Sequence, residues 1–419
     1  MFHRGYLGVC TAAESRHRPR ETGGQGSGRR PAQGLTLVAL ALGTFAIGTG
    51  EFASNGVVQL FAAHLGTSVP TATYAITAYA AGVIIGSPVI TVAAAKVNRR
   101  TVVLGLMLLF IAGNLLSSLA GNIAMLIVFR FVTGWVQGAY FGAAAVVAGY
   151  VYGPGRGGKA FATVMGGLTV ATLVGSPLGT LLAQHLGWQA MYVAVAGVGA
   201  LALGALFAWV PRTGDLAGSS VRQELGSLRN RMVWITLAVA ALGISSIFAV
   251  YTFIGIFVTD AAKQPAGLIP FALAVFGLGM AVGNLTGGRL ADRWESAGLI
   301  TGYAGTLVVL VVIRLAGQTF GVLLPCLFAV GALMMLAIPT IQVRLTSFAP
   351  TAPTLMGALN LAALNVANSF GAIGGSITLN AGWGTLSTVW AGFALTSVGL
   401  VLYLVAIPKA RVQPELARA

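Results

Sequence analysis

Long apolar runs recur along this chain, and they restrict its fold more than any other feature of the sequence. A transmembrane helix needs about 20 consecutive apolar residues, and runs of this length follow one another from Leu35 to Ile407. Charged residues make up 8% of the chain and hydrophobic residues 57%, whereas an average soluble domain carries about 25% charged residues. The sequence therefore predicts an all-α integral membrane protein.

The apolar runs predict twelve transmembrane helices, divided by a polar stretch into two sets of six. We place the spans near residues 36–58, 72–95, 101–120, 123–147, 159–184, 189–210, 232–259, 268–290, 297–315, 320–343, 354–379 and 385–407. Residues 1–34 are predicted to be a disordered cytosolic tail without the apolar core of a signal peptide. Two six-helix halves follow, at 35–210 and 232–408, with a cytosolic linker between them at 211–231. Residues 409–419 are predicted to be a second cytosolic tail.

The placement of Lys and Arg predicts the orientation in the membrane. Nearly all of the basic residues fall in one set of alternate connections, whereas the other set offers only Lys263 and Arg314. Cytosolic loops carry the excess of basic residues, so we expect a multi-pass protein of the cytoplasmic (inner) membrane with both termini in the cytosol. The net charge of +15 then reflects membrane topology, which argues against nucleic-acid binding. We expect a monomer whose partners are the lipid bilayer and a small-molecule substrate.

An internal repeat supports the division into two halves. The segments GSPVITVAAAK (86–96) and GNLTGGRLADR (283–293) have the same length, and each ends the second helix of its half before a basic turn. Paired halves with a site between them are typical of transporters. The sequence therefore predicts two pseudo-symmetric halves around a central cavity.

At this point the chain resembles the drug:proton antiporters of the major facilitator superfamily, in the branch of the arabinose-efflux permease and the chloramphenicol exporters. The resemblance is carried by LALGTFAIGTGEF (40–52), RFVTGWVQGAYFG (130–142), GLTVATLVGSPLGT (167–180), GWQAMYV (187–193) and GGRLADR (287–293). One motif departs from the family: the loop after the second span reads AAAKVNRR (93–100), with Ala95 in place of the acid and Asn98 in place of the glycine. The resemblance implies transport by alternating access and no enzymatic activity.

Glu51 is the one acidic residue well inside an apolar span. A charge at membrane depth costs several kcal/mol, about 3 on insertion scales, so by default it has a function. Arg130 lies at matching depth, because each residue is about seven positions from the outer end of its span, or roughly 10 Å at helical rise. Burial favours the protonated form of a carboxyl group and a nearby guanidinium the ionised form, so we expect these two residues to couple transport to protons. The alternative is a static ion pair that only joins two helices.

Two groups of residues predict gating or close helix packing. Gly167, Gly175, Pro177 and Gly179 form the motif that, by resemblance, hinges or seals the cavity of exporters; the alternative is simple small-residue packing. Gly288, Asp292 and Arg293 stand where the eighth span meets its cytosolic turn. Asp292 is predicted to form an ion pair when the inside is closed, and the alternative is a solvated surface acid.

Polar residues in the spans are the candidates for contact with substrate. They are Asn55, Tyr79, Gln137, Tyr251, Asn360, Asn365 and Asn368. Asn365 and Asn368 are three positions apart, so they are expected on one helix face. Hydrogen bonds between helices are the alternative role for each of these side chains.

The sequence thus predicts proton-coupled efflux of small amphiphilic drugs, with compounds similar to chloramphenicol as one possibility. The proton is the coupling ion and no other cofactor is expected, because the sequence has no phosphate-binding loop of the form G-x-x-x-x-G-K-[ST] and no cluster of Cys or His with metal-ligand spacing. The alternative is an exporter of a sugar or another polar metabolite. The sparse polar side chains of the spans favour apolar drugs.

Overall fold

The computed structural model describes residues 29–94, 96–153, 157–212, 226–293, 296–349 and 353–406. Within these ranges the secondary structure is helical and contains no strand. The elements are α1 (Arg29–Gly56), α2 (Val58–His64), α3 (Val69–Ala72), α4 (Tyr74–Ala93), α5 (Arg99–Ser118), α6 (Ile123–Gly134), α7 (Val136–Tyr152), α8 (Gly157–Val170), η1 (Ala171–Gly175), α9 (Ser176–Leu186), α10 (Trp188–Trp209), η3 (Gly226–Arg229), α12 (Arg231–Gly243), α13 (Ser245–Tyr251), α14 (Ile254–Ile256), η4 (Phe257–Ala261), η5 (Ala266–Leu268), α15 (Ile269–Arg293), α16 (Ala297–Ala316), α17 (Phe320–Phe348), α18 (Pro353–Asn380), η6 (Thr385–Ser387) and α19 (Thr388–Ala406).

The predicted class, an all-α integral membrane protein, is confirmed. Eleven helical segments of the described chain are long and apolar enough to cross a membrane. The remaining predicted span, 354–379, corresponds to α18, which has 28 residues and is therefore also long enough. It carries three asparagines, Asn360, Asn365 and Asn368. Polar residues within a span mark the helix that faces a cavity rather than lipid.

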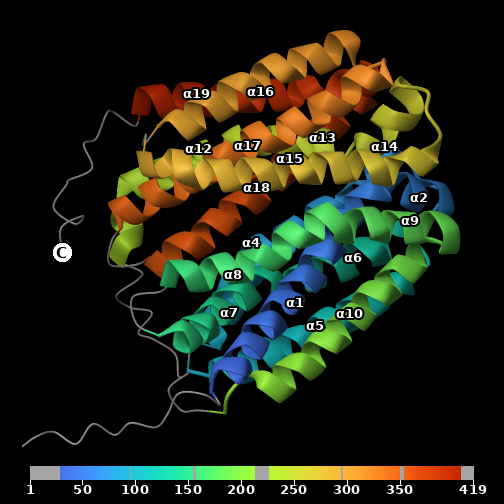
Figure 1. The fold of residues 1–419 in the computed structure, drawn as a ribbon. Helices are drawn as coiled ribbons and strands as arrows, with labels where there is room; N and C mark the ends of the chain where they lie inside the picture. The colour runs from blue at the N-terminus through green and yellow to red at the C-terminus, as the bar shows by residue number, and fades with distance from the viewer. Residues whose placement is uncertain are drawn as a thin grey trace, which may run out of the picture.

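The helices form two groups that lie side by side (Figure 1). One group contains α1 to α10 and the other α12 to α19, and α18 crosses between them to pack on α4 and α7. Helix α1 begins and α19 ends at the same end of the bundle, which we call the terminal end. Helices α2, α9 and α14 lie at the opposite end. Asn98 and Asn122 cap helices at the two different ends: their side chains accept hydrogen bonds from the backbone N–H of Arg100 and Met125.

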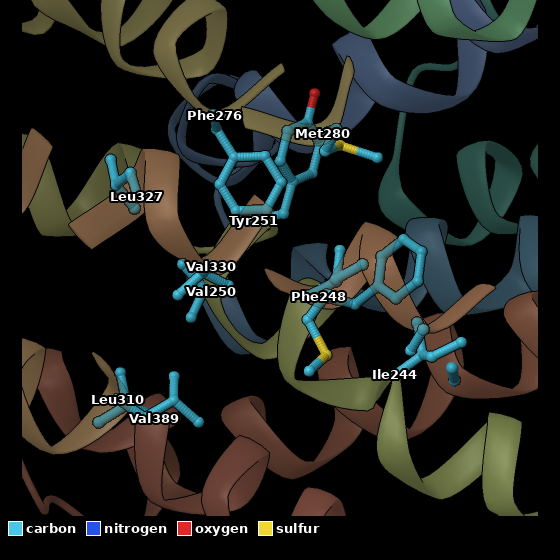
Figure 2. Close-up of a cluster of buried hydrophobic side chains, with 14 of the residues drawn as sticks. Ile244, Phe248, Val250, Tyr251, Phe276, Met280, Leu310, Leu327, Val330 and Val389 are labelled. Carbon is cyan, nitrogen blue, oxygen red and sulfur yellow. The ribbon is translucent and has the colours of Figure 1, made fainter. Parts of the chain in front are cut away.

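Each group has its own hydrophobic core. The largest core cluster belongs mainly to the second group, and Figure 2 shows part of it, with Tyr251, Phe276 and Met280 close together. Phe52 of α1 also belongs to this cluster, and its ring meets that of Tyr251 edge-on at 5.7 Å between centroids. The residue after Glu51 therefore joins the first group to the core of the second.

Three of the predicted glycines let α8, η1 and α9 pack directly on α1. A side-chain carbon at Gly167 would meet the carbonyl oxygen of Ala41, and one at Gly175 would meet the hydroxyl of Thr49. A side-chain carbon at Gly179 would lie 2.8 Å from that of Ala53. These glycines, which we call the glycine stripe, follow α1 on both sides of Glu51 along the chain.

A π-helical turn interrupts this packed segment just before Pro177. Residues Ala171–Gly175 form η1, and α9 follows with Pro177 in its first turn. A proline ring collides with the carbonyl four residues earlier in a regular helix, here that of Leu173, and a widened turn is one way to absorb this collision. Gly277 of α15 packs against this turn, since a side-chain carbon there would lie 2.7 Å from the Thr172 carbonyl oxygen. The turn therefore lies where the two groups meet.

Hydrogen bonds between side chains join the two groups toward the opposite end. We call them the polar layer, and each member of a pair comes from a different group. The pairs and their distances are Asn55 with Thr252 (2.9 Å), Ser176 with Tyr251 (2.6 Å), Thr73 with Ser376 (2.6 Å) and Gln59 with Thr259 (3.1 Å). All of these side chains are uncharged.

Candidate substrate cavity

A cavity of about 380 Å³ lies between the two groups of helices. On α18, the residues that line it lie between Gly357 and Asn365. Gly357 is near the start of α18, at the terminal end. Ser376, which belongs to the polar layer, is farther along α18 and does not line the cavity. The full lining is Glu51, Phe52, Gln137, Met165, Leu168, Thr169, Thr172, Ile244, Ile247, Phe248, Met280, Asn284, Met335, Ile338, Pro339, Gln342, Gly357, Asn360, Leu361, Leu364 and Asn365.

Most of the lining side chains are apolar, and three of them are methionines from three helices. Met165, Met280 and Met335 belong to α8, α15 and α17. The unbranched thioether side chain adapts to different shapes and makes favourable contacts with aromatic rings. The cavity therefore suits apolar or aromatic bodies of varied outline.

Glu51 carries the one acidic group among the described lining residues. Its side chain is 4% exposed, and its Oε2 accepts a hydrogen bond of 2.7 Å from Nε2 of Gln137 on α7. Asn55 holds the backbone at this point, because its Nδ2 donates to the carbonyl oxygen of Glu51 at 3.1 Å. The carboxyl group is thus oriented at the edge of the cavity by side chains that carry no charge.

Arg130 is on α6 and contacts α1 at the residue before Glu51, but it does not line the cavity. It is 1% exposed, and its Nη2 donates to the carbonyl oxygen of Gly50 at 3.2 Å. Its guanidinium lies over the ring of Tyr79 at 4.2 Å from the centroid and faces that of Tyr192 at 5.4 Å. Within the described residues, no ion pair of 4.0 Å or less joins it to Glu51. The cation is stabilised by aromatic rings and a backbone carbonyl.

The polar residues predicted to contact substrate fall into two sets. Gln137, Asn360 and Asn365 line the cavity with Glu51. The others are buried outside the lining: Asn55 and Tyr251 in the polar layer, Tyr79 beneath Arg130, and Asn368 with neither of its polar side-chain atoms hydrogen-bonded.

The predicted gating residues of the second half lie at the end of α15. Gly288, Asp292 and Arg293 belong to the last turns of α15. Their side chains are not among those described, so the predicted ion pair of Asp292 stays a prediction.

A sequence model described as the Major Facilitator Superfamily matches residues 40–372. The chain belongs to this superfamily. The resemblance inferred from its motifs is thereby confirmed, and the protein is a multi-pass membrane transporter by family.

Two relatives of this superfamily member cover nearly its whole length. It is 33% identical over 381 residues to the inner membrane transport protein YdhP of Escherichia coli K12, and the match covers 90% of this chain and 97% of YdhP. It is also 33% identical over 381 residues to a chloramphenicol resistance protein of Streptomyces lividans, covering 89% of this chain and 96% of that protein. A bacterial homologue of the human lysosomal transporter Spinster, solved in an inward-facing and unoccupied conformation, has the same fold with a TM-score of 0.61, at 16% identity and 90% and 96% coverage.

Several lining residues of this transporter were missed by reasoning from the sequence. The methionines, Thr169, Thr172 and Gln342 gave no distinct signal, because spans that are apolar on every side do not reveal which face is turned inward. Pro339 was a sequence feature that could have pointed to this part of the cavity wall. A proline inside a transmembrane helix frees a backbone carbonyl, and Pro339 and Gln342 lie one turn apart on α17.

Proposed function

We propose that this transporter exports small amphiphilic compounds across the cytoplasmic membrane by alternating access, driven by protons that move inward. The observation that carries the proposal is the composition of the cavity wall, in which one buried carboxyl group stands among methionine, leucine, isoleucine and phenylalanine side chains. Binding sites for small molecules combine such apolar walls with a few polar groups. A single acid at membrane depth supplies a site for the coupling proton.

The cavity and the polar layer fit one state of an alternating-access cycle. The polar layer joins the two groups toward the opposite end, and the lining extends from Glu51 toward the terminal end. The distribution of basic residues assigns the terminal end to the cytosol. We therefore infer a state that receives compounds from the cytosol, with the outward path closed by the polar layer.

The proposed cycle uses Glu51 twice. With Glu51 ionised and held by Gln137, the compound enters from the cytosol and fills the apolar cavity. When the halves rock and the polar layer separates, the carboxyl group meets the outer solution and takes up a proton, and the compound leaves. The protonated, uncharged site then returns inward at lower cost, because a neutral group is less costly to enclose than an ion, and the carboxyl group releases its proton to the cytosol before the next compound binds.

The proton gradient supplies enough free energy for this export. One proton moving through ~100 mV provides about 2.3 kcal/mol, with about 1.4 kcal/mol more for each pH unit. With a pH difference of one unit and one proton exchanged for one neutral compound, this free energy supports a concentration ratio of roughly a few hundred.

The test is accumulation of labelled chloramphenicol in everted membrane vesicles. We expect accumulation with a proton gradient, loss of accumulation with an uncoupler, and loss in Glu51→Gln at unchanged protein content in the membrane. Asp260→Asn is the matched control. Asp260 is exposed in η4 and accepts a hydrogen bond from Thr259, and the amide keeps an acceptor oxygen there. Unchanged, uncoupler-sensitive accumulation in Glu51→Gln would refute the role of Glu51.

The same vesicles address the alternative of a sugar or polar-metabolite exporter. A sugar presents hydroxyl groups on all sides, so its site needs many hydrogen-bonding partners, and the walls formed by α8, α13 and α17 are mainly apolar. Accumulation of labelled arabinose, with none of chloramphenicol, would favour the alternative.

A further inference from the structure

Two arginines of the first group of helices face the same aromatic ring. Arg100 is the second residue of α5, and its Cζ lies 5.4 Å from the ring centroid of Phe207 on α10. Arg212 follows the end of α10, and its Cζ lies 5.6 Å from the same centroid. A guanidinium within about 6 Å of a ring centroid is attracted to the face of the ring. We call Arg100 and Arg212 the arginine pair.

The hydrogen bonds of the pair leave donors for a ligand. Nη2 of Arg100 donates to the carbonyl oxygen of Phe207 at 2.7 Å, which satisfies one of the carbonyl groups left open at the end of α10. Nε of Arg100 is buried without a partner, whereas Nη1 is not buried. Arg212 is exposed, and its guanidinium makes no hydrogen bond to the part of the chain that the structure describes. Nη1 of Arg100 and the whole guanidinium of Arg212 are therefore available.

No acidic side chain neutralises the pair in the described structure. Glu51 is the one acidic residue between positions 29 and 212 of the sequence, and it is buried at the cavity. In the ranges that the structure describes, neither arginine forms an ion pair of 4.0 Å or less. Lys96, exposed in the turn before α5, adds further positive charge. Cations held together without a counter-charge repel each other and attract an anion.

The arginine pair lies where the protein meets the boundary of the bilayer. Thr36, near the start of α1, donates to the carbonyl oxygen of Trp209 at 2.6 Å, which places the end of α10 at the terminal end. Trp209 and Phe207 are exposed, and tryptophan is enriched at the interface between membrane and water. Farther along the two helices, Leu108 of α5 and Leu201 of α10 are exposed as well. Such apolar residues suit contact with lipid chains.

We propose that the arginine pair binds the phosphate group of an anionic phospholipid in the cytosolic leaflet. The planar guanidinium matches the geometry of phosphate, and basic pockets on the cytosolic side of transmembrane helices bind anionic head groups. The phosphate meets Arg212 and Nη1 of Arg100, and the acyl chains lie on the exposed apolar residues of α5 and α10. A free phosphate ion has no use for these apolar residues. Because Arg212 is the second residue of the predicted linker, the lipid holds the start of the connection between the halves.

The test is native mass spectrometry of the purified full-length protein, delipidated in detergent and titrated with phosphatidylglycerol. Phosphatidylcholine is the comparison lipid, because it has the same phosphate ester but no net charge. A basic residue near anionic lipid contributes about fivefold in affinity, so we expect phosphatidylglycerol to bind about fivefold more weakly in Arg100→Gln or Arg212→Gln and about 25-fold more weakly in the double variant. Wild-type protein should prefer phosphatidylglycerol to phosphatidylcholine.

The double variant Arg229→Gln with Arg231→Gln is the matched control. These two arginines are exposed at the start of the second group, in η3 and α12. Neither faces an aromatic ring among the described residues. The control removes the same charge, and we expect its affinity to stay within about twofold of wild type, because salt screens exposed charges over roughly 10 Å.

The substitution Phe207→Leu tests the ring without a change of charge. Leucine keeps an apolar side chain but removes the face on which both guanidinium groups lie. We expect binding of phosphatidylglycerol to weaken about 2- to 5-fold, as for an exposed cation–π contact. Wild-type affinity in this variant would contradict the placement of the pair by the ring.

Three outcomes would overturn the lipid site. Equal weakening in the two double variants would show only a general attraction to basic residues. Equal affinity of wild-type protein for the two lipids would exclude selection of an anion. Displacement of phosphatidylglycerol by inorganic phosphate at a similar concentration would assign the pair to a free ion. None of these outcomes bears on the proposed export, because the lipid site lies outside the cavity and does not rest on that proposal.

Discussion

The substitution Gly167→Ala tests whether the glycine stripe sets the distance between α8 and α1. The added carbon would meet the Ala41 carbonyl oxygen and the Thr44 hydroxyl, and it would lie 2.9 Å from the backbone nitrogen of Phe45. Two of these three obstacles are backbone atoms, so a change of side-chain rotamer cannot relieve the overlap and the helices must separate. Overpacking of this kind costs about 1–3 kcal/mol.

The neighbouring substitution Gly166→Ala is the matched control. A side-chain carbon at Gly166 has no atom within 4 Å. Both substitutions gain the same helix propensity, about 1 kcal/mol, so their difference isolates the packing cost of about 1–3 kcal/mol.

Thermal unfolding in detergent measures this difference. With Cys10 replaced by serine in both variants, the remaining thiol is that of Cys326; it is buried, so its reaction with a fluorogenic dye reports unfolding. We expect the midpoint of Gly167→Ala to lie a few degrees below that of Gly166→Ala. Equal midpoints for the two variants would refute the close contact between α8 and α1.

Two further predictions concern the polar layer and the buried cation. In a cysteine-free background, Thr73→Cys with Ser376→Cys should form a disulfide on oxidation, because the two native hydroxyl oxygens are 2.6 Å apart. Vesicle accumulation of chloramphenicol should then stop and return on reduction; transport by the oxidised protein would show that the polar layer need not open. Arg130→Lys should lower the unfolding midpoint, because an ammonium lacks the planar stacking that the guanidinium makes on Tyr79 at 4.2 Å; a wild-type midpoint would contradict this.

The fold was largely predictable because a helix that crosses the bilayer needs a long apolar segment, and the sequence has such a segment at every span. The helical interruptions were less visible. The π-helical turn at Ala171–Gly175 depends on how Pro177 is accommodated against α1 and α15, and that is a property of the packed structure. The polar character of α18 was also visible, but not the reason for it, since a row of asparagines can join helices or line a cavity.

The candidate site was predictable where a residue type is rare at membrane depth. Glu51 stood out for this reason, and the structure places it at the cavity. Residue spacing was a weaker guide. Asn365 and Asn368 are three positions apart and differ by about 60° around the helix axis, and only Asn365 lines the cavity. Arg130 was predicted at the depth of Glu51, but its contacts with Gly50 and Tyr79 depend on side-chain packing that no spacing rule gives.

The uncharged character of the polar layer has a consequence for the energetics of opening. Mobile ions screen charges and leave neutral hydrogen bonds nearly unaffected, so separating these pairs should depend little on ionic strength. Their side chains also do not titrate in the physiological range, the phenol of Tyr251 included. Within the described residues, carboxyl groups contact these parts at two places, the buried Glu51 at the cavity and the exposed Asp260 beside Thr259. A transport curve for a single proton that persists in Asp260→Asn would assign the dependence on acidity to Glu51.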